Sequence, residues 1–204
     1  MTLASLVFRQ RFVLVKDGLD RLLALCGLLI FLPLLALLAA LIKLSSPGPV
    51  FFIQQRVGRR GSRFGIIKLR TMVADAERAT GPIWAQQNDP RITPLGRFLR
   101  ATHFDEVPQL INVIRGDMSL VGPRPERPVF VEQFLREIPN YGERLRVKPG
   151  ITGLAQVYHH YDATVRDVKR KLAFDLLYIK RMCLMVDIAI LFLTLRRVTG
   201  KGAR

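Results

Sequence analysis

The chain has 204 residues, a formal net charge of +16 and a hydrophobic content of 50%. The length suits one domain with its own core. A chain that is both very apolar and very basic is expected to meet lipid or a deep core with one part and an anionic partner with the rest. Two cysteines, and three histidines without metal-ligand spacing, exclude a disulfide framework and a zinc module.

Residues 22–42 form an uncharged apolar run. At ~1.5 Å per residue the run could cross a bilayer core of ~30 Å, and it is too long, and lacks the small-residue site, for a cleavable signal peptide. Pro33 near its middle would kink a helix. Basic residues flank both ends, which the positive-inside rule places on the cytoplasmic side. We therefore expect a re-entrant helix bent at Pro33, with a straight span or a buried core helix as the alternatives.

Two strands around a Gly/Arg turn are predicted next, at residues 50–57 and 64–69. Residues 73–90 are polar and predict a helix followed by a loop. Thr93 and Pro94 then form a helix start, with a capping hydroxyl before a proline in the first turn.

A further helix is predicted from about residue 106 to residue 115, ending at Gly116. Pro108 fits only its first turn, so Asp105 is expected at the N-cap. Residues 117–127 read as a loop, residues 129–138 as a short helix, residues 146–157 as a turn-rich connection and residues 162–181 as a long charged helix.

The C-terminal stretch has an apolar part too short to span a membrane, contains Asp187, and carries basic residues behind it. We expect an amphipathic helix at a membrane interface, with a core helix and basic tail as the alternative. The elements predict a mostly helical α+β fold with a re-entrant membrane helix, one small β-hairpin and several amphipathic interfacial helices. Residues 1–48 would form the membrane part and residues 49–204 the second domain.

Residues 103–125, "HFDEVPQLINVIRGDMSLVGPRP", concentrate charge and turn residues. An ionised Asp105 can be a nucleophile or a metal ligand, and Glu106 could orient a partner or act as a base, although an Asp at an N-cap is common without any function. The prolines around Arg124 would hold its guanidinium ready for a phosphate.

Further positive charge in this region comes from Lys68, Arg70, Arg146 and Lys148. For each of these the plain alternative is a solvated surface charge. Together with the paired carboxylates they predict a site for a diphosphate whose charge Mg²⁺ shields.

Several long motifs occur in one order: "KDGLDRLL", "SSPGPVFFIQQRVGRRG", "KLRTM", "LRATHFDEVPQLINVIRGDMSLVGPRP", "RVKPGITGLAQV" and "FDLLYIK". From about residue 16 to residue 195 the chain thereby resembles the small monotopic polyprenyl-phosphate phosphoglycosyl transferases, bacterial sugar transferases that begin glycan assembly on a lipid carrier. The single apolar run corresponds to a minimal, catalytic-core version.

The resemblance implies transfer of a sugar phosphate from a UDP-sugar to polyprenyl phosphate, commonly undecaprenyl phosphate, with release of UMP. It assigns Asp105 as the nucleophile of a ping-pong scheme and as the residue nearest Mg²⁺, with Glu106 as its catalytic partner. It assigns phosphate or substrate binding, or support of the site, to Lys68, Arg70, Arg100, Arg124, Pro125 and Asp175. Lys148 is a further candidate for phosphate binding because of its positive charge. It also implies a helix that breaks at a proline, here Pro33, and stays in one leaflet on the cytoplasmic face of the bacterial inner membrane.

Three positions depart from the family pattern. Leu32 replaces the serine usual before Pro33, Leu154 replaces an aromatic residue, and an arginine-containing run is replaced by Tyr158-His159-His160. His160 is then the candidate to replace the family's basic residue at phosphate.

Two other functions compete with this one. A non-catalytic membrane-bound module that binds anionic lipid or a partner enzyme would also explain the apolar run and the charge. Nucleic-acid binding is disfavoured, because the charges are dispersed and no basic-aromatic module is present. The expected partners are a UDP-sugar, polyprenyl phosphate and membrane lipids, and the sequence leaves a homodimer open.

Overall fold

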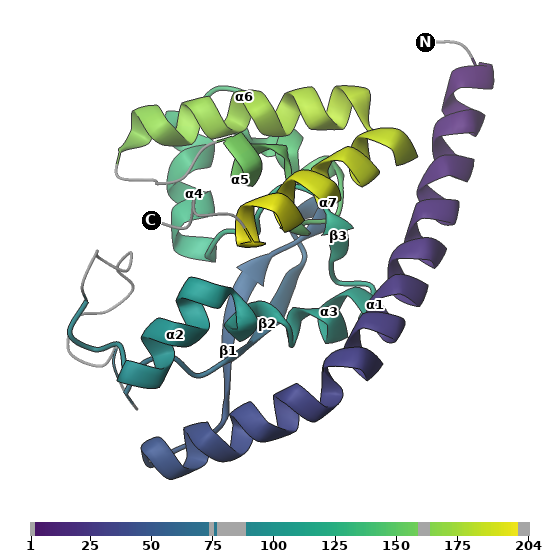
Figure 1. The fold of residues 1–204 in the computed structure, drawn as a ribbon. Helices are drawn as coiled ribbons and strands as arrows, with labels where there is room; N and C mark the ends of the chain where they lie inside the picture. Colours follow the sequence, from purple (N-terminus) through teal and green to yellow (C-terminus); the bar gives the residue numbers. More distant parts are fainter. Residues whose placement is uncertain (1–2, 74–75, 77–88, 159–163, 200–204) are drawn as a thin grey trace.

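The computed structural model describes residues 3–73, 76, 89–158 and 164–199 (Figure 1). In chain order its elements are α1 (Leu3–Ser45), β1 (Phe51–Val57), the 3₁₀ turn η1 (Arg59–Gly61), β2 (Arg63–Leu69), α2 (Pro94–Thr102), η2 (Phe104–Glu106), α3 (Gln109–Arg115), β3 (Ser119–Val121), α4 (Pro128–Glu137), η3 (Tyr141–Arg146), β4 (Gly150–Thr152), α5 (Leu154–Tyr158), α6 (Val165–Arg181) and α7 (Leu184–Thr199). The prediction of a mostly helical α+β fold with one small hairpin is confirmed.

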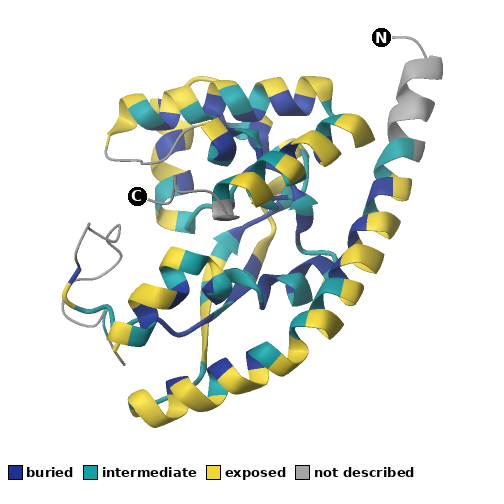
Figure 2. Cartoon of the chain, in the orientation of Figure 1, coloured by how far each residue is buried: buried dark blue, intermediate teal, exposed yellow. Residues whose placement is uncertain are grey.

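The long helix α1 runs without interruption through Pro33. Figure 1 shows that it curves around the rest of the molecule, as expected for a helix that lacks a backbone hydrogen bond at an internal proline. Its segment Phe12–Ser45 is long and apolar enough to cross a membrane. Much of its surface is exposed (Figure 2), including Leu29, Ile30 and Leu44. The re-entrant path stays a prediction.

The hairpin of β1 and β2 is the centre of the fold. The strands are antiparallel, with Phe52 opposite Lys68 and Val57 opposite Arg63. One end of the hairpin packs with α1 and α2 in a cluster formed by Leu35, Leu38, Ile42, Leu69 and Leu99. Both predicted strands are confirmed to within a residue at each end.

A second pair of strands was not predicted. β3 and β4 are parallel, with Ser119 opposite Gly150, and they lie in stretches expected to be loop and turn. Three residues each are too short for an alternating pattern, so the pairing left no signal. Gly122 permits it, because a Cβ there would lie 2.5 Å from the Lys148 carbonyl oxygen.

The remaining predictions vary in outcome. The Thr93 cap is confirmed, since its hydroxyl accepts a hydrogen bond from the Gly96 amide. The helix of residues 129–138 is confirmed as α4. The long charged helix expected at residues 162–181 is α6, which begins at Val165, where Thr164 and Asp167 form a capping box. Most of residues 73–90, and residues 159–163, lie outside the described part of the chain.

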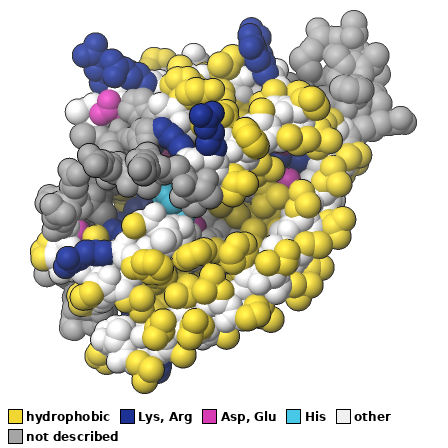
Figure 3. Space-filling view, viewed as in Figure 1, with side chains coloured by type: hydrophobic (Ala, Val, Ile, Leu, Met, Phe, Trp, Pro, Cys, Tyr) yellow, Lys and Arg dark blue, Asp and Glu magenta, His cyan; other side chains and the backbone are white. Residues whose placement is uncertain are grey.

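α7 has the two faces of an amphipathic helix. Asp187 and Ile190 are buried, whereas Met185, Ile188 and Phe192 are exposed. Figure 3 shows hydrophobic side chains gathered over α7 and along α1. The predicted apolar outer face of α7 is therefore present.

A buried polar network ties α1 to the rest of the fold. Lys16 Nζ lies 2.6 Å from Asp187 Oδ2 of α7 and 3.2 Å from Asp20 Oδ2 of α1 itself. Ser119 of β3 donates to Asp20 at 2.5 Å, and the Tyr178 hydroxyl of α6 lies 2.8 Å from Asp187 Oδ1 and 3.0 Å from the Val121 carbonyl oxygen. The network joins α1, α6, α7 and β3 directly before the loop that carries Arg124.

This network predicts a large effect for Lys16→Met. The variant leaves Asp20 and Asp187 buried without their cation, and removing one partner of a buried ion pair costs about 3–5 kcal/mol. We expect the midpoint temperature of thermal unfolding of the purified variant to be about 10 °C lower than that of wild type. Lys169→Met, at an exposed position of α6, is the control and should leave the midpoint unchanged; equal midpoints for the two variants would contradict this account.

Candidate active site

A sharp turn between α2 and η2 presents the Asp105–Glu106 pair. His103 ends α2 in the left-handed conformation, with φ 58°, which is uncommon outside glycine but tolerated by histidine. Asp105 lies in the middle of η2, and α3 begins only at Gln109 with Pro108 as its N-cap. The expected N-cap position of Asp105 is therefore wrong. The proline displaced the helix start by three residues, and the carboxylate is held by the turn instead.

Glu106 is clamped by two cations from other parts of the chain. Its Oε1 accepts hydrogen bonds from Lys68 Nζ of β2 and from Arg124 Nη2, both at 2.7 Å. Burial disfavours the charged carboxylate, but Arg124 and Lys68 outweigh burial and hold the pKa of Glu106 well below its usual range. Glu106 is thus ionised and fully engaged at neutral pH.

Asp105 has the opposite environment. Its residue is 7% exposed, and no described residue donates a hydrogen bond to its carboxylate. Burial raises the pKa of Asp105, and the negative Glu106 adds to this, while Lys68, Arg100 and Arg124 pull the pKa down without restoring the usual value. The carboxylate therefore sits among cations with its oxygens uncommitted.

Arg100 stands close to Asp105 from the last turn of α2. Its Nε donates to the Thr71 hydroxyl at 2.9 Å. Burial lowers the pKa of Arg100, and Asp105 is the leading opposing influence. Arg100 thus supplies positive charge to Asp105 while Thr71 fixes its direction.

The loop that carries Arg124 is supported from behind. The Arg124 carbonyl oxygen accepts from Arg144 Nη2 at 2.9 Å, and Arg144 is bound in turn by Asp175 of α6 and by the Tyr141 hydroxyl, each at 2.9 Å. Asp175 therefore contacts the Arg124 loop through Arg144, and the part that the resemblance gives it in the site stays a prediction.

Arg56 of β1 holds the same loop from its other side. Its Nη1 donates to the Pro125 carbonyl oxygen at 3.1 Å, and burial lowers its pKa to about 10. Sequence reasoning missed Arg56, Arg144 and Tyr141, because nothing in one sequence separates a buried arginine from a solvated one.

Two expected phosphate-binding residues, Arg70 and Lys148, make their described contacts away from the carboxylate pair. Arg70 donates to the carbonyl oxygens of Pro47, Ser46 and Ile42, at 2.8, 2.8 and 3.3 Å, so it binds the C-terminal end of α1, where carbonyl groups lack partners. Lys148 binds Asp17 of α1 at 2.7 Å. His160 lies outside the described residues.

Comparison with known proteins identifies the family. The bacterial sugar transferase family matches this chain over residues 10–201. The chain belongs to the bacterial sugar transferases.

Characterised members of the family are similar along most of this chain. It is 46% identical over 203 residues to a UDP-N-acetylgalactosamine-undecaprenyl-phosphate N-acetylgalactosaminephosphotransferase of Aeromonas hydrophila, which covers 99% of this chain and 48% of that protein. It is 44% identical over 184 residues to a UDP-glucose:undecaprenyl-phosphate glucose-1-phosphate transferase of Escherichia coli (strain K12). That match covers 89% of this chain and 39% of the relative. The chain thus spans about half the length, or less, of these two relatives.

A relative of similar length is the exopolysaccharide production protein PSS of Rhizobium leguminosarum bv. phaseoli. It is 38% identical over 200 residues, covering 93% of this chain and 98% of that protein.

The chemistry of this bacterial sugar transferase fits Mg²⁺ in one respect. Within the part of the chain that the structure describes, no three His, Cys, Asp or Glu side chains are grouped so that they could hold a metal alone. Mg²⁺ commonly binds through one or two carboxylates together with substrate phosphates and water. Asp105, whose oxygens have no described donor, suits that role, whereas the oxygens of Glu106 are taken by cations.

The clamp predicts how stability depends on Glu106. Glu106→Gln should cost about 2 kcal/mol near pH 7, less than a fully buried pair because the Arg124 side chain keeps 38% exposure. The pKa of Glu106 is lower in the folded than in the unfolded chain, so its stabilisation is present above the unfolded pKa and is lost as pH falls through the folded pKa.

Thermal unfolding of wild type and variant across pH tests this. We expect the difference in unfolding midpoint between wild type and Glu106→Gln to stay constant down to about pH 5. It should shrink as the pH falls below the ordinary glutamate range. Glu132→Gln, which breaks an exposed pair with Arg63, is the control and should cost about 0.5 kcal/mol at most. A gap for Glu106→Gln that closes near pH 6 would contradict the low pKa.

Proposed function

We propose that this bacterial sugar transferase moves a sugar 1-phosphate from a UDP-sugar to polyprenyl phosphate and releases UMP. The observation that carries the proposal is the contrast within the carboxylate pair: Glu106 is neutralised by Lys68 and Arg124, while Asp105 beside it has no described donor. The printed names of the Aeromonas and Escherichia relatives, which pair a UDP-sugar with undecaprenyl phosphate, support the same reaction.

The reaction proceeds in two displacements. An Asp105 carboxylate oxygen attacks the phosphorus that bears the sugar, the bond from that phosphorus to the bridging oxygen breaks, and UMP departs with the bridging oxygen. A phosphate oxygen of the polyprenyl phosphate then attacks the same phosphorus, and the aspartate oxygen leaves as carboxylate. The products are polyprenyl diphosphate sugar and the regenerated enzyme.

The residues around Asp105 have separate tasks. Lys68, Arg124 and Arg100 place positive charge where the transferring phosphoryl group carries negative charge. Glu106 fixes the two cations of its clamp, and Arg144 and Arg56 fix the loop that presents Arg124. Bound Mg²⁺ held by Asp105 would shield the diphosphate.

The membrane part keeps the site at the surface of the bilayer. A polyprenyl chain cannot leave the bilayer cheaply, since each buried CH₂ is worth ~0.8 kcal/mol. The apolar outer surfaces of α1 and α7 support contact of both helices with lipid (Figure 3). In this proposal α1 enters one leaflet at the cytoplasmic face without crossing. Asp105 would then meet the water-borne donor first and the lipid phosphate second.

Asp105→Asn tests the reaction. With UDP-N-acetylgalactosamine, UDP-glucose and other UDP-sugars as donors, undecaprenyl phosphate and Mg²⁺, wild type should release UMP with at least one donor, and Asp105→Asn should release it at least about 10³-fold more slowly because the nucleophile is lost. Glu132→Gln should match wild type. Equal release by wild type and Asp105→Asn would remove Asp105 as nucleophile, and a folded wild type without release for any donor would favour the non-catalytic membrane module.

The pH profile tests the environment of Asp105. The nucleophile is the ionised form, so the first displacement should slow as pH falls through the raised pKa of Asp105, above the ordinary aspartate value of about 3.9. Arg100→Gln removes a cation that lowers this pKa, so the acid limb should move to higher pH. Arg97→Gln, at an exposed position of the same helix, should leave the limb in place; movement of the limb in both variants, or in neither, would contradict the assignment.

A further inference from the structure

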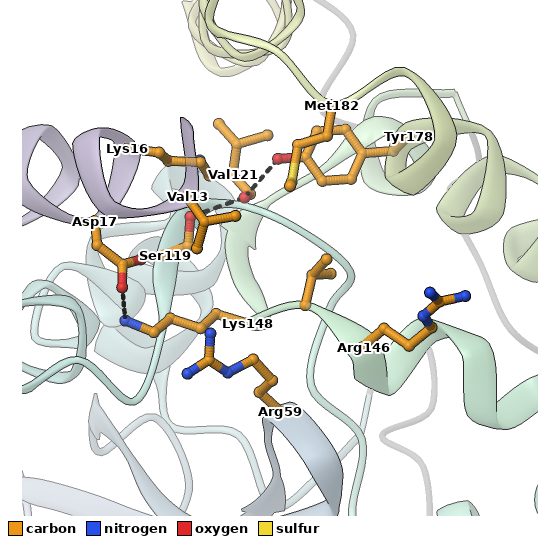
Figure 4. Close-up of a pocket in the computed structure, with 11 residues that line it drawn as sticks. Val13, Lys16, Asp17, Arg59, Ser119, Val121, Arg146, Lys148, Tyr178 and Met182 are labelled. Atoms are coloured by element: carbon orange, nitrogen blue, oxygen red, sulfur yellow. Dashed lines mark hydrogen bonds and ion pairs between the residues drawn. The ribbon is translucent and has the colours of Figure 1, made fainter. Parts of the chain in front are cut away.

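A cavity of about 50 Å³ lies between α1, the tip of the hairpin and the segment around Lys148. Residues of α1, η1, β3, η3 and the C-terminal end of α6 line it, together with the two residues that follow η3. Its charged lining residues are Lys16, Asp17, Arg59, Arg146 and Lys148. Neither Asp105 nor any of the residues that hold Glu106 lines it. Figure 4 shows these side chains converging from segments far apart in the sequence.

The cavity carries more positive than negative charge. Lys16 is neutralised by Asp187 and Asp20 in the buried network, and Lys148 binds Asp17 at 2.7 Å. Arg146 pairs with Glu143, but both side chains are exposed, and such a pair is weak enough to open.

Arg59, unlike the other cations of the cavity, has no counter-charge among the described residues. Its side chain is half-buried in η1, and no described residue accepts a hydrogen bond from its guanidinium. Figure 4 shows the guanidinium turned toward the stem of Lys148. Four cationic side chains and one carboxylate line the cavity, and this positive balance in a partly enclosed space creates a local potential that attracts an anion.

We propose that this cavity binds a phosphate group through Arg59 and Lys148, separately from the site of sugar-phosphate transfer. A guanidinium offers two parallel donors to phosphate oxygens, and an ammonium adds a point charge. Arg146 can turn in from η3 as a third cation.

The position along α1 favours the headgroup of an anionic phospholipid as the source of the phosphate. The uncharged apolar run starts at Leu22, five residues after Asp17. Five residues correspond to about 8 Å of helix. That distance matches the headgroup layer outside the hydrocarbon core, which is ~5–8 Å deep on each side. Free phosphate shares the chemistry and is distinguished by experiment.

A bound phosphate would join α1 to the hairpin and to η3. Lys148 is already fixed to Asp17 of α1, while Arg59 sits at the tip of the hairpin. The ligand would therefore stabilise the docking of α1, and binding should appear as a rise in the unfolding temperature that saturates with ligand.

The test measures thermal unfolding of the purified full chain in neutral detergent micelles, with added short-chain phosphatidylglycerol, short-chain phosphatidylcholine or inorganic phosphate. The variants are Arg59→Gln and, as matched control, Arg60→Gln, which removes an equal charge at the exposed neighbour that does not line the cavity. Because Arg59 has no described partner, its loss should leave the protein folded without ligand.

Phosphatidylglycerol should raise the unfolding midpoint of wild type, and phosphatidylcholine should not. The apparent affinity should fall about tenfold or more in Arg59→Gln, as expected for loss of a charge-assisted bond. In Arg60→Gln it should fall by no more than the roughly fivefold effect of one charge near an anionic surface. Stabilisation by inorganic phosphate alone, with the same dependence on Arg59, would keep the site and assign it a soluble ligand.

Three results would overturn the proposal. The first is equal weakening of binding in both variants, and the second is no stabilisation by either phosphate probe. The third is loss of UMP release in Arg59→Gln when anionic lipid is absent, which would make Arg59 part of the transfer site itself.

Discussion

The clamp on Glu106 is the interaction on which the rest of the site depends. Lys68 and Arg124 come from a strand and from a loop 56 positions later in the chain, and both meet one carboxylate oxygen at 2.7 Å. Lys68 and Arg124 donate their hydrogen bonds to Glu106. The adjacent Asp105 therefore has the same positive surroundings but no described hydrogen-bond donor. Burial raises the pKa of Asp105, whereas Arg124 and Lys68 outweigh burial and lower the pKa of Glu106. Neighbouring carboxylates with pKa values shifted in opposite directions are a common mark of a site that does chemistry.

The surroundings of the clamp form successive layers of support. Asp175 and Tyr141 hold Arg144, Arg144 holds the carbonyl of Arg124, and Arg124 holds Glu106. The polar network of Lys16 reaches the same region through β3, where Tyr178 contacts the Val121 carbonyl just before the loop. α1 and the loop that carries Arg124 are thus parts of one connected structure, so the depth of α1 in a bilayer would set the height of Asp105 above it.

The sequence predicts the regular elements better than the site that they carry. The hairpin, α2 with its Thr93 cap, α4 and the long apolar helix each leave a local signal in apolar spacing, proline or a capping residue. β3 and β4 leave none, because a three-residue parallel pair is specified by partners about thirty positions away. The roles of Arg70, Arg144 and Lys148 could not be separated for the same reason: each is one arginine or lysine among 32, and only the fold decides that Arg70 binds the end of α1, that Arg144 supports the loop and that Lys148 meets Asp17. Asp105 and Glu106 could be singled out, but their difference in environment could not, since it depends on Lys68 and Arg124 reaching the second residue and not the first.

The most direct test of the central claim is to trap the intermediate on Asp105. Wild-type protein is incubated with a UDP-sugar that supports UMP release, without polyprenyl phosphate, then denatured and digested for mass spectrometry. The account predicts that the peptide containing Asp105 gains the mass of one sugar phosphate, and that the gain disappears when polyprenyl phosphate is added before denaturation. A protein that turns over this donor but carries the sugar phosphate on another residue, or on none, would contradict the account.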